Sequence, residues 1–139
     1  MSAILVLDVS ATLPWCFDDE GDAAGTALLS RVADSAILVP ALWHTELANA
    51  LLQAERRHRI ISGDLTEFLD LLSSLAIETD HEGSRHALGP LLALARRHKL
   101  TVYDATYLDL ALRSGLPLAT RDRALRRAAS ACGVTLIDD

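Results

Sequence analysis

Few residues in this sequence belong to the types that form disulfides or metal clusters. The 139 residues include two cysteines, Cys16 and Cys132, which lie far apart and form no CxxC pair. This usage is typical of a protein of the reducing cytosol. No HExxH motif occurs and the five histidines are scattered, so the sequence gives no indication of a zinc site.

Long hydrophobic runs and targeting signals are also missing. The first apolar run ends at Asp8, too early for a signal peptide, and no basic segment precedes it. No apolar stretch approaches the length that crosses a membrane. We therefore expect a cytoplasmic protein without membrane contact.

Positive charge is in deficit, because the net charge is −6. Passive binding to nucleic acid is disfavoured by such a balance. The basic residues nevertheless gather in three clusters, at positions 55–59, 96–99 and 121–127. Two interpretations remain open for each cluster: a contact surface for RNA, or solvated helix ends stabilised by the helix dipole.

Aromatic residues make up only 4% of the sequence, whereas 50% is hydrophobic and the mean hydropathy is +0.23. A core of Leu, Ala, Val and Ile is typical of helices packed on a parallel sheet. The high hydrophobic content also predicts a further buried surface, such as a dimer or partner interface.

Short apolar segments alternate with helical patterns along the chain. We predict one domain over residues 1–139, of the α/β class, with three α/β/α layers and a central, mainly parallel sheet. Strands are expected at 3–7, 36–39, 76–79, 118–119 and 134–137. Helices are expected at 11–17, 23–33, 42–59, 65–72, 84–98 with a break near Pro90, 104–113 and 122–131.

Acidic residues follow short apolar segments or begin helices at Asp8, Glu46, Asp104 and Asp122. Strand ends and the loops after them form the functional crevice of an open α/β sheet. Two carboxylates about 4 Å apart repel by roughly 4 kcal/mol at an effective dielectric constant near 20. A hard divalent cation removes that repulsion, so the pattern predicts a Mg²⁺ or Mn²⁺ site used on phosphate esters.

Each acid also has an ordinary interpretation when it is taken alone. Asp8, Asp104 and Asp122 fit helix N-caps, and Glu46 fits a glutamate favoured by the helix dipole. Asp109 lies about 140° around the helix from Asp104, so we expect it at the surface. The combination of four acids is what favours a metal site.

Four further residues are candidates for auxiliary roles. Ser10 is placed to orient Asp8 or a water molecule, and Thr120 to contact the same metal or water. Asn49 shares a helix face with Glu46 in an otherwise apolar stretch. Arg121 belongs to a group with Arg123, Arg126 and Arg127 around Asp122, and one member of this group is expected to contact a substrate phosphate or to pair with an acidic neighbour.

Four stretches in order resemble the PIN-domain ribonucleases, specifically the VapC-type toxins of toxin–antitoxin pairs. They are LVLDVSA at 5–11, VPAL at 39–42 with ELANAL at 46–51, YDATYLDLA at 103–111, and LPLATRD at 116–122. The resemblance implies that Asp8, Glu46, Asp104 and Asp122 bind Mg²⁺ or Mn²⁺. It also implies endonucleolytic cleavage of RNA, a homodimer, and a VapB-like antitoxin, with which we expect a heterotetramer or larger complex. Our hypothesis for the mechanism is attack by a metal-activated water.

Other functions fit the sequence less well. A phosphotransferase of the haloacid dehalogenase type needs a second aspartate two residues after the first, where this chain has Ser10. Two alternatives within the family stay open: an RNA-processing nuclease outside any toxin–antitoxin pair, and a non-catalytic protein that only binds a partner.

Overall fold

The computed structural model of the chain describes residues 2–17 and 22–137. In chain order the elements are β1 (Ala3–Leu7), α1 (Val9–Thr12), a 3₁₀ turn (Leu13–Trp15), α2 (Ala23–Val32), β2 (Ala36–Pro40), α3 (Leu42–Arg56), α4 (Ser62–Ser74), β3 (Ala76–Asp80), a 3₁₀ turn (Gly83–His86), a π-helical turn (Ala87–Leu91), α5 (Leu92–His98), α6 (Val102–Ser114), β4 (Leu118–Ala119) and α7 (Arg123–Ala131). The single domain over residues 1–139 stays a prediction, because its ends lie outside the described residues.

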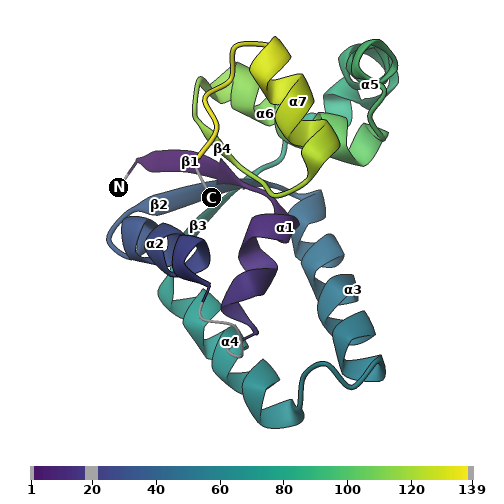
Figure 1. The fold of residues 1–139 in the computed structure, drawn as a ribbon. Helices are drawn as coiled ribbons and strands as arrows, with labels where there is room; N and C mark the ends of the chain where they lie inside the picture. The colour runs from purple at the N-terminus through teal and green to yellow at the C-terminus, as the bar shows by residue number, and fades with distance from the viewer. Residues whose placement is uncertain (1, 18–21, 138–139) are drawn as a thin grey trace.

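The four strands form one sheet in the order β3-β2-β1-β4, and every pair of neighbours is parallel. Figure 1 shows α5, α6 and α7 on one side of this sheet and α1 to α4 on the other. The predicted fold class, a three-layer α/β/α domain with a parallel sheet, is confirmed. Since the strands are parallel, the chain leaves all of them at the same edge.

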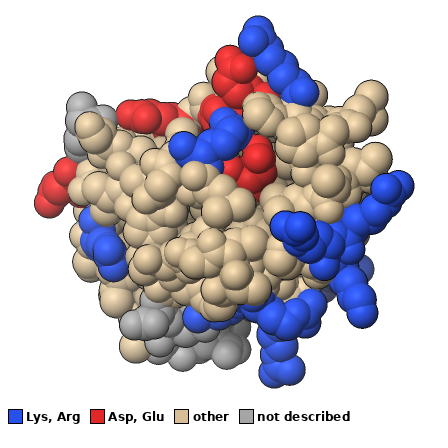
Figure 2. Space-filling view, turned by 90° about the horizontal axis from the view of Figure 1, so that it is seen from above, with Lys and Arg blue, Asp and Glu red and all other residues tan. Residues whose placement is uncertain are grey.

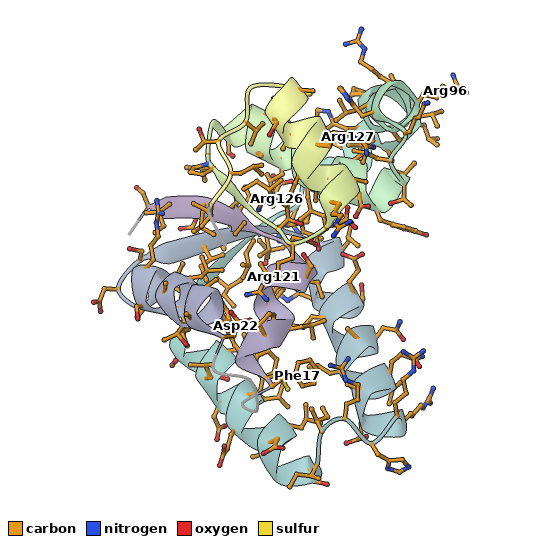
Figure 3. All side chains as sticks on the ribbon, viewed as in Figure 1. Phe17, Asp22, Arg96, Arg121, Arg126 and Arg127 are labelled. Atoms are coloured by element: carbon orange, nitrogen blue, oxygen red, sulfur yellow. The ribbon has the colours of Figure 1, made fainter. Side chains whose placement is uncertain are left out.

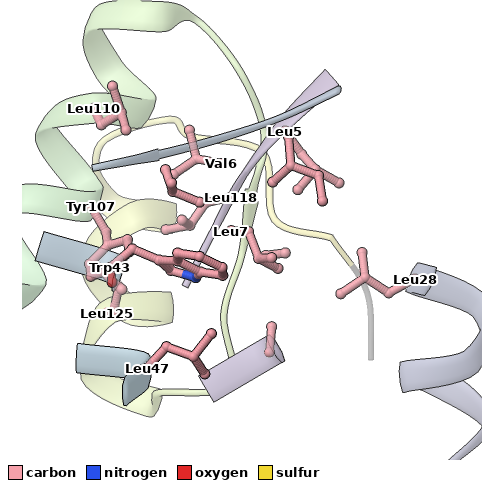
Figure 4. Close-up of a cluster of buried hydrophobic side chains, with 14 of the residues drawn as sticks. Leu5, Val6, Leu7, Leu28, Trp43, Leu47, Tyr107, Leu110, Leu118 and Leu125 are labelled. Atoms are coloured by element: carbon pink, nitrogen blue, oxygen red, sulfur yellow. The ribbon is translucent and has the colours of Figure 1, made fainter. Parts of the chain in front are cut away.

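The central strand β1 supplies the middle of the core. Leu5, Val6 and Leu7 are completely buried, as expected for a strand covered by helices on both faces. Figure 4 shows these side chains in one buried cluster with Leu28, Trp43 and Tyr107. The burial fixes the end of β1, and therefore fixes the position of the residue that follows it, Asp8.

Three predicted elements differ from the structure. Residues 134–137 form no full strand and make a single parallel bridge between Leu118 and Leu136. The segment 84–98 is divided into a 3₁₀ turn, a π-helical turn that contains Pro90, and α5; proline lacks the N–H that a continuous helix requires. Residues 11–17 form the end of α1 and a 3₁₀ turn rather than one helix.

Within residues 2–17 and 22–137, no helix combines the length and the apolar character needed to cross a bilayer.

Candidate metal-binding active site

Asp8 follows β1 directly and is 6% exposed. Its N–H donates to the carbonyl of Ala119 at 3.0 Å, which holds the residue beside the end of β4. Its Oδ2 accepts hydrogen bonds from the hydroxyls of Ser10 at 2.7 Å and Thr120 at 2.6 Å. Burial raises the pKa of Asp8, and the two hydroxyls oppose that increase by stabilising the carboxylate.

Ser10 and Thr120 connect residues that lie more than a hundred positions apart. Their hydroxyl oxygens are 3.2 Å from each other. The backbone N–H of Arg121 donates to Oγ of Ser10 at 2.8 Å, and the N–H of Asp122 donates to Oγ1 of Thr120 at 3.1 Å. Both hydroxyls thus hold the carboxylate of Asp8 in place. For Ser10, orienting Asp8 is one of the two roles that the sequence predicted.

Glu46 lies in the second turn of α3 and accepts a hydrogen bond at Oε1 from the hydroxyl of Tyr107 at 2.5 Å. Burial is the main cause of the raised pKa of Glu46, and the charges of Asp8 and Asp104 add to it. The sequence interpretation missed Tyr107. Its position three residues after Asp104, on the same face of α6, was a usable signal.

Asp104 is in the first turn of α6 and is not its N-cap, so that part of the prediction is wrong. The cap is Thr101, whose Oγ1 accepts a hydrogen bond from the N–H of Asp104 at 3.0 Å. Burial, together with the charges of Asp122 and Asp8, raises the pKa of Asp104 to about 6. A hydrogen bond with Thr101 lowers the pKa of the Asp104 carboxyl, but it is the smallest of the effects on that group.

Asp122 caps α7, as predicted, and its Oδ1 accepts from the N–H of Leu125 at 2.8 Å. The negative charge of Asp122 contributes to the raised pKa of both Asp8 and Asp104. Each of the four acids therefore interacts electrostatically with at least one other. They come from the ends of β1 and β4, from α3 and from α6, so only the folded chain brings them together.

The donor chemistry of this group suits a hard cation, because carboxylate and hydroxyl oxygens are what Mg²⁺ and Mn²⁺ prefer. The side-chain arrangement is more open than a closed cage. Among the described residues, no three His, Cys, Asp or Glu side chains are so placed that they could hold a metal ion together. The four acids thus have the oxygen ligands that a divalent cation prefers. Their side chains, as they lie in this structure, do not yet surround one position for the ion.

The other candidate residues have separate roles. Arg121 pairs with Asp22 through Nη1 and Oδ2 at 2.7 Å, so an acidic neighbour is the partner that the structure shows. Figure 3 shows this pair lying between α1 and α2. Asn49 is exposed, and no hydrogen bond within the described residues joins its side chain to the four acids. His44 forms a hydrogen bond with Thr79 and places its ring edge-on to Trp43.

Asp109 was predicted at the surface, and this is wrong. It is 8% exposed, and its Oδ2 accepts from Nε of Arg113 at 2.8 Å. Arg113 also donates to both carboxylate oxygens of Asp80, at 3.2 and 2.9 Å. The helical angle correctly separated Asp109 from Asp104, but an arginine one turn later allows an acid to be buried on the other face.

Similarity to known proteins adds to this geometry. A sequence model of the PIN domain matches residues 5–131. The chain belongs to the PIN-domain family. It is 33% identical over 105 residues to Ribonuclease VapC3 of two Mycobacterium tuberculosis strains, CDC 1551 / Oshkosh and H37Rv, and the match covers 74% of this chain and 72% of each relative. The sequence resemblance to VapC-type PIN domains is therefore confirmed, and the phosphotransferase alternative is excluded.

Solved structures show the same fold. PAE2754 from Pyrobaculum aerophilum superposes with a TM-score of 0.69 at 25% identity, over 97% of this chain and 84% of that one. FitAcB from Neisseria gonorrhoeae superposes with a TM-score of 0.64 at 16% identity, over 97% of both chains. Nearly the whole of this PIN domain thus has a counterpart in known structures.

Proposed function

We propose that this PIN domain is an endoribonuclease that depends on Mg²⁺ or Mn²⁺, with Asp8, Glu46, Asp104 and Asp122 as its metal ligands and catalytic residues. The observation that carries the proposal is that the fold buries the carboxyl groups of Asp8, Glu46 and Asp104 beside one another, so that burial first, and the charges of neighbouring acids second, raise their pKa values. A fold that holds acids together against their repulsion provides a place where a cation binds favourably. The relative named Ribonuclease VapC3 supports RNA as the substrate.

When bound, the cation supplies charge neutralisation at the phosphodiester and lowers the pKa of water. The chain's own residues position the reacting groups. Ser10 and Thr120 hold the Asp8 carboxylate, and Tyr107 holds that of Glu46. Asp104, whose pKa burial and the neighbouring acids raise to about 6, is the carboxylate that we assign to accept the proton of the attacking water.

The partners belong to the same proposal. The similarity to the relative named Ribonuclease VapC3 supports including a VapB-like antitoxin and a homodimer in this proposal. Light scattering after gel filtration, alone and with the antitoxin, measures both assemblies.

Cleavage of a total-RNA pool tests the enzymatic proposal. Wild-type protein is compared in Mg²⁺ and in chelator with Asp8→Asn, and Asp70→Asn on the exposed face of α4 is the matched control. Discrete fragments with 5′-phosphate and 3′-hydroxyl ends are expected from wild type and Asp70→Asn in Mg²⁺ only. Fragments ending in a 2′,3′-cyclic phosphate would contradict attack by water. Absence of cleavage with every divalent ion would favour a protein that only binds a partner.

A further inference from the structure

Positive charge is concentrated around α5 and α7 although the whole chain is acidic. Segments 91–103 and 123–137 contain none of the 19 Asp and Glu residues. They contain six of the 13 Lys and Arg residues, which are Arg96, Arg97, Lys99, Arg123, Arg126 and Arg127. Figure 2 shows several blue side chains along the right and lower right of the molecule, where no red ones are visible; other blue side chains lie beside the red ones near the top.

A hollow of about 460 Å³ lies between the C-terminal end of α5 and the outer face of α7. Its lining is formed by Arg97, His98 and Lys99 from the first segment and by Arg127, Ala128 and Ala131 from α7. Figure 3 shows Arg96 and Arg127 on these neighbouring helices, on the same side of the sheet. We call this surface the cationic hollow.

The charges that line the cationic hollow are not neutralised by the rest of the described chain. Arg97, Lys99 and Arg127 are exposed, and none of them forms an ion pair with a described residue. By contrast, Arg113 and Arg121 each pair with aspartate. Stabilisation of helix ends explains the cations at the last turn of α5, but Arg127 lies in the middle of α7. A negatively charged ligand would explain both the cations at the end of α5 and Arg127 in the middle of α7.

Two of the four acids adjoin the helices around the cationic hollow. Asp122 is the N-cap of α7, and Arg127 lies about 7.5 Å further along its axis and about 140° around it. Both α5 and α7 pack against α6, whose first turn holds Asp104. Lys99 is five residues before Asp104. The acids by themselves repel an RNA backbone, so a substrate strand needs cations beside them to be held.

We propose that the cationic hollow binds backbone phosphate of the RNA strand that is cleaved at the four acids; this rests on the proposed function. Phosphate contacts position a strand without reading its sequence. Arg97 and Arg127 are therefore positioning residues. Their loss is expected to weaken RNA binding equally for different base sequences.

The test is the affinity of a fluorescently labelled single-stranded oligouridine for the protein in chelator, where the proposed cleavage cannot occur. The double variant Arg97→Gln/Arg127→Gln is compared with Arg31→Gln/Arg56→Gln, which removes the same charge from exposed arginines elsewhere that form no ion pair with a described residue. The slope of log affinity against log salt concentration should fall by roughly 0.7 for each phosphate that is no longer bound, about 1.4 in all, in the first variant only. Because these side chains are exposed, all melting temperatures should be equal.

The proposal is overturned if both double variants bind alike, or if the wild type does not bind oligouridine at low salt. It is also overturned if polyglutamate, but not RNA, loses affinity in Arg97→Gln/Arg127→Gln, which would assign the surface to an acidic protein segment. The nuclease proposal fails separately. A wild type that binds through the cationic hollow but never cleaves RNA refutes catalysis, and active enzyme whose KM is unchanged by the double variant refutes the hollow.

Discussion

The hydroxyl of Tyr107 donates a hydrogen bond to Oε1 of Glu46 at 2.5 Å and so connects α6 to α3 beside the four acids. Tyr107 is completely buried, and burial raises its pKa far above the ordinary value, so the hydroxyl keeps its proton and stays a donor. One turn of α6 thus provides a candidate ligand, Asp104, and the group that orients another, Glu46.

Tyr107→Phe should increase the pKa of Glu46, because the hydrogen bond that lowers it is removed. We expect a loss of about 1.5–3 kcal/mol in the free energy of unfolding, since the bond involves a charged acceptor. Affinity for Mn²⁺ at pH 7.5 should fall as well. Urea denaturation and Mn²⁺ titration measure the two effects. Tyr103→Phe is the control, because Tyr103 is 65% exposed. Unchanged Mn²⁺ affinity in Tyr107→Phe would make Tyr107 a core residue only.

Asp104→Asn should stabilise the metal-free protein at neutral pH. The pKa of Asp104 in the fold is about 6, above its unfolded value of 3.8, so the fold favours the protonated form. Its contribution to stability is complete below pH 3.8 and is lost as the pH rises through about 6. After allowance for solvent screening, the variant should gain about 1–2 kcal/mol at about pH 7.5 and nothing at about pH 4.

Thermal melts from pH 4 to 8, with and without Mg²⁺, measure this difference. Saturating Mg²⁺ should stabilise wild type more than Asp104→Asn, because only the wild type keeps the carboxylate. Asp22, with a pKa lowered to about 2 by Arg121, loses its contribution only as the pH falls from about 4 to 2, so it does not affect the comparison. A variant that melts below wild type at pH 7.5 would show that Asp104 is not held under repulsion.

Asp109→Asn should affect stability and leave chemistry unchanged. It removes one of the two aspartates that hold Arg113 between α6 and the end of β3. We expect a loss of about 1–3 kcal/mol in the free energy of unfolding, as for other buried, charged hydrogen bonds. The kcat of RNA cleavage, measured well below the melting temperature, should equal that of wild type. A reduced kcat at normal stability would place Asp109 in the site.

The sequence was sufficient for the parts of the structure that depend on local patterns. The buried run before Asp8 predicts β1, and a strand end predicts the edge where acids gather. The sequence was insufficient where the position of a side chain depends on a residue that is distant in the chain or on another helix. Arg113 and Asp80 determine that Asp109 is buried, and Thr101 takes the capping role predicted for Asp104. The contact between Tyr107 and Glu46 spans 61 positions and depends on how α6 packs against α3.

Binding of Mn²⁺, followed by the electron paramagnetic resonance signal of the free ion, tests most directly whether the four acids form a metal site. Wild type and Asp70→Asn should remove Mn²⁺ from solution, whereas Asp8→Asn and Glu46→Gln should bind far less while circular dichroism shows them folded. Equal Mn²⁺ binding by wild type and Asp8→Asn would contradict a cation site at these residues.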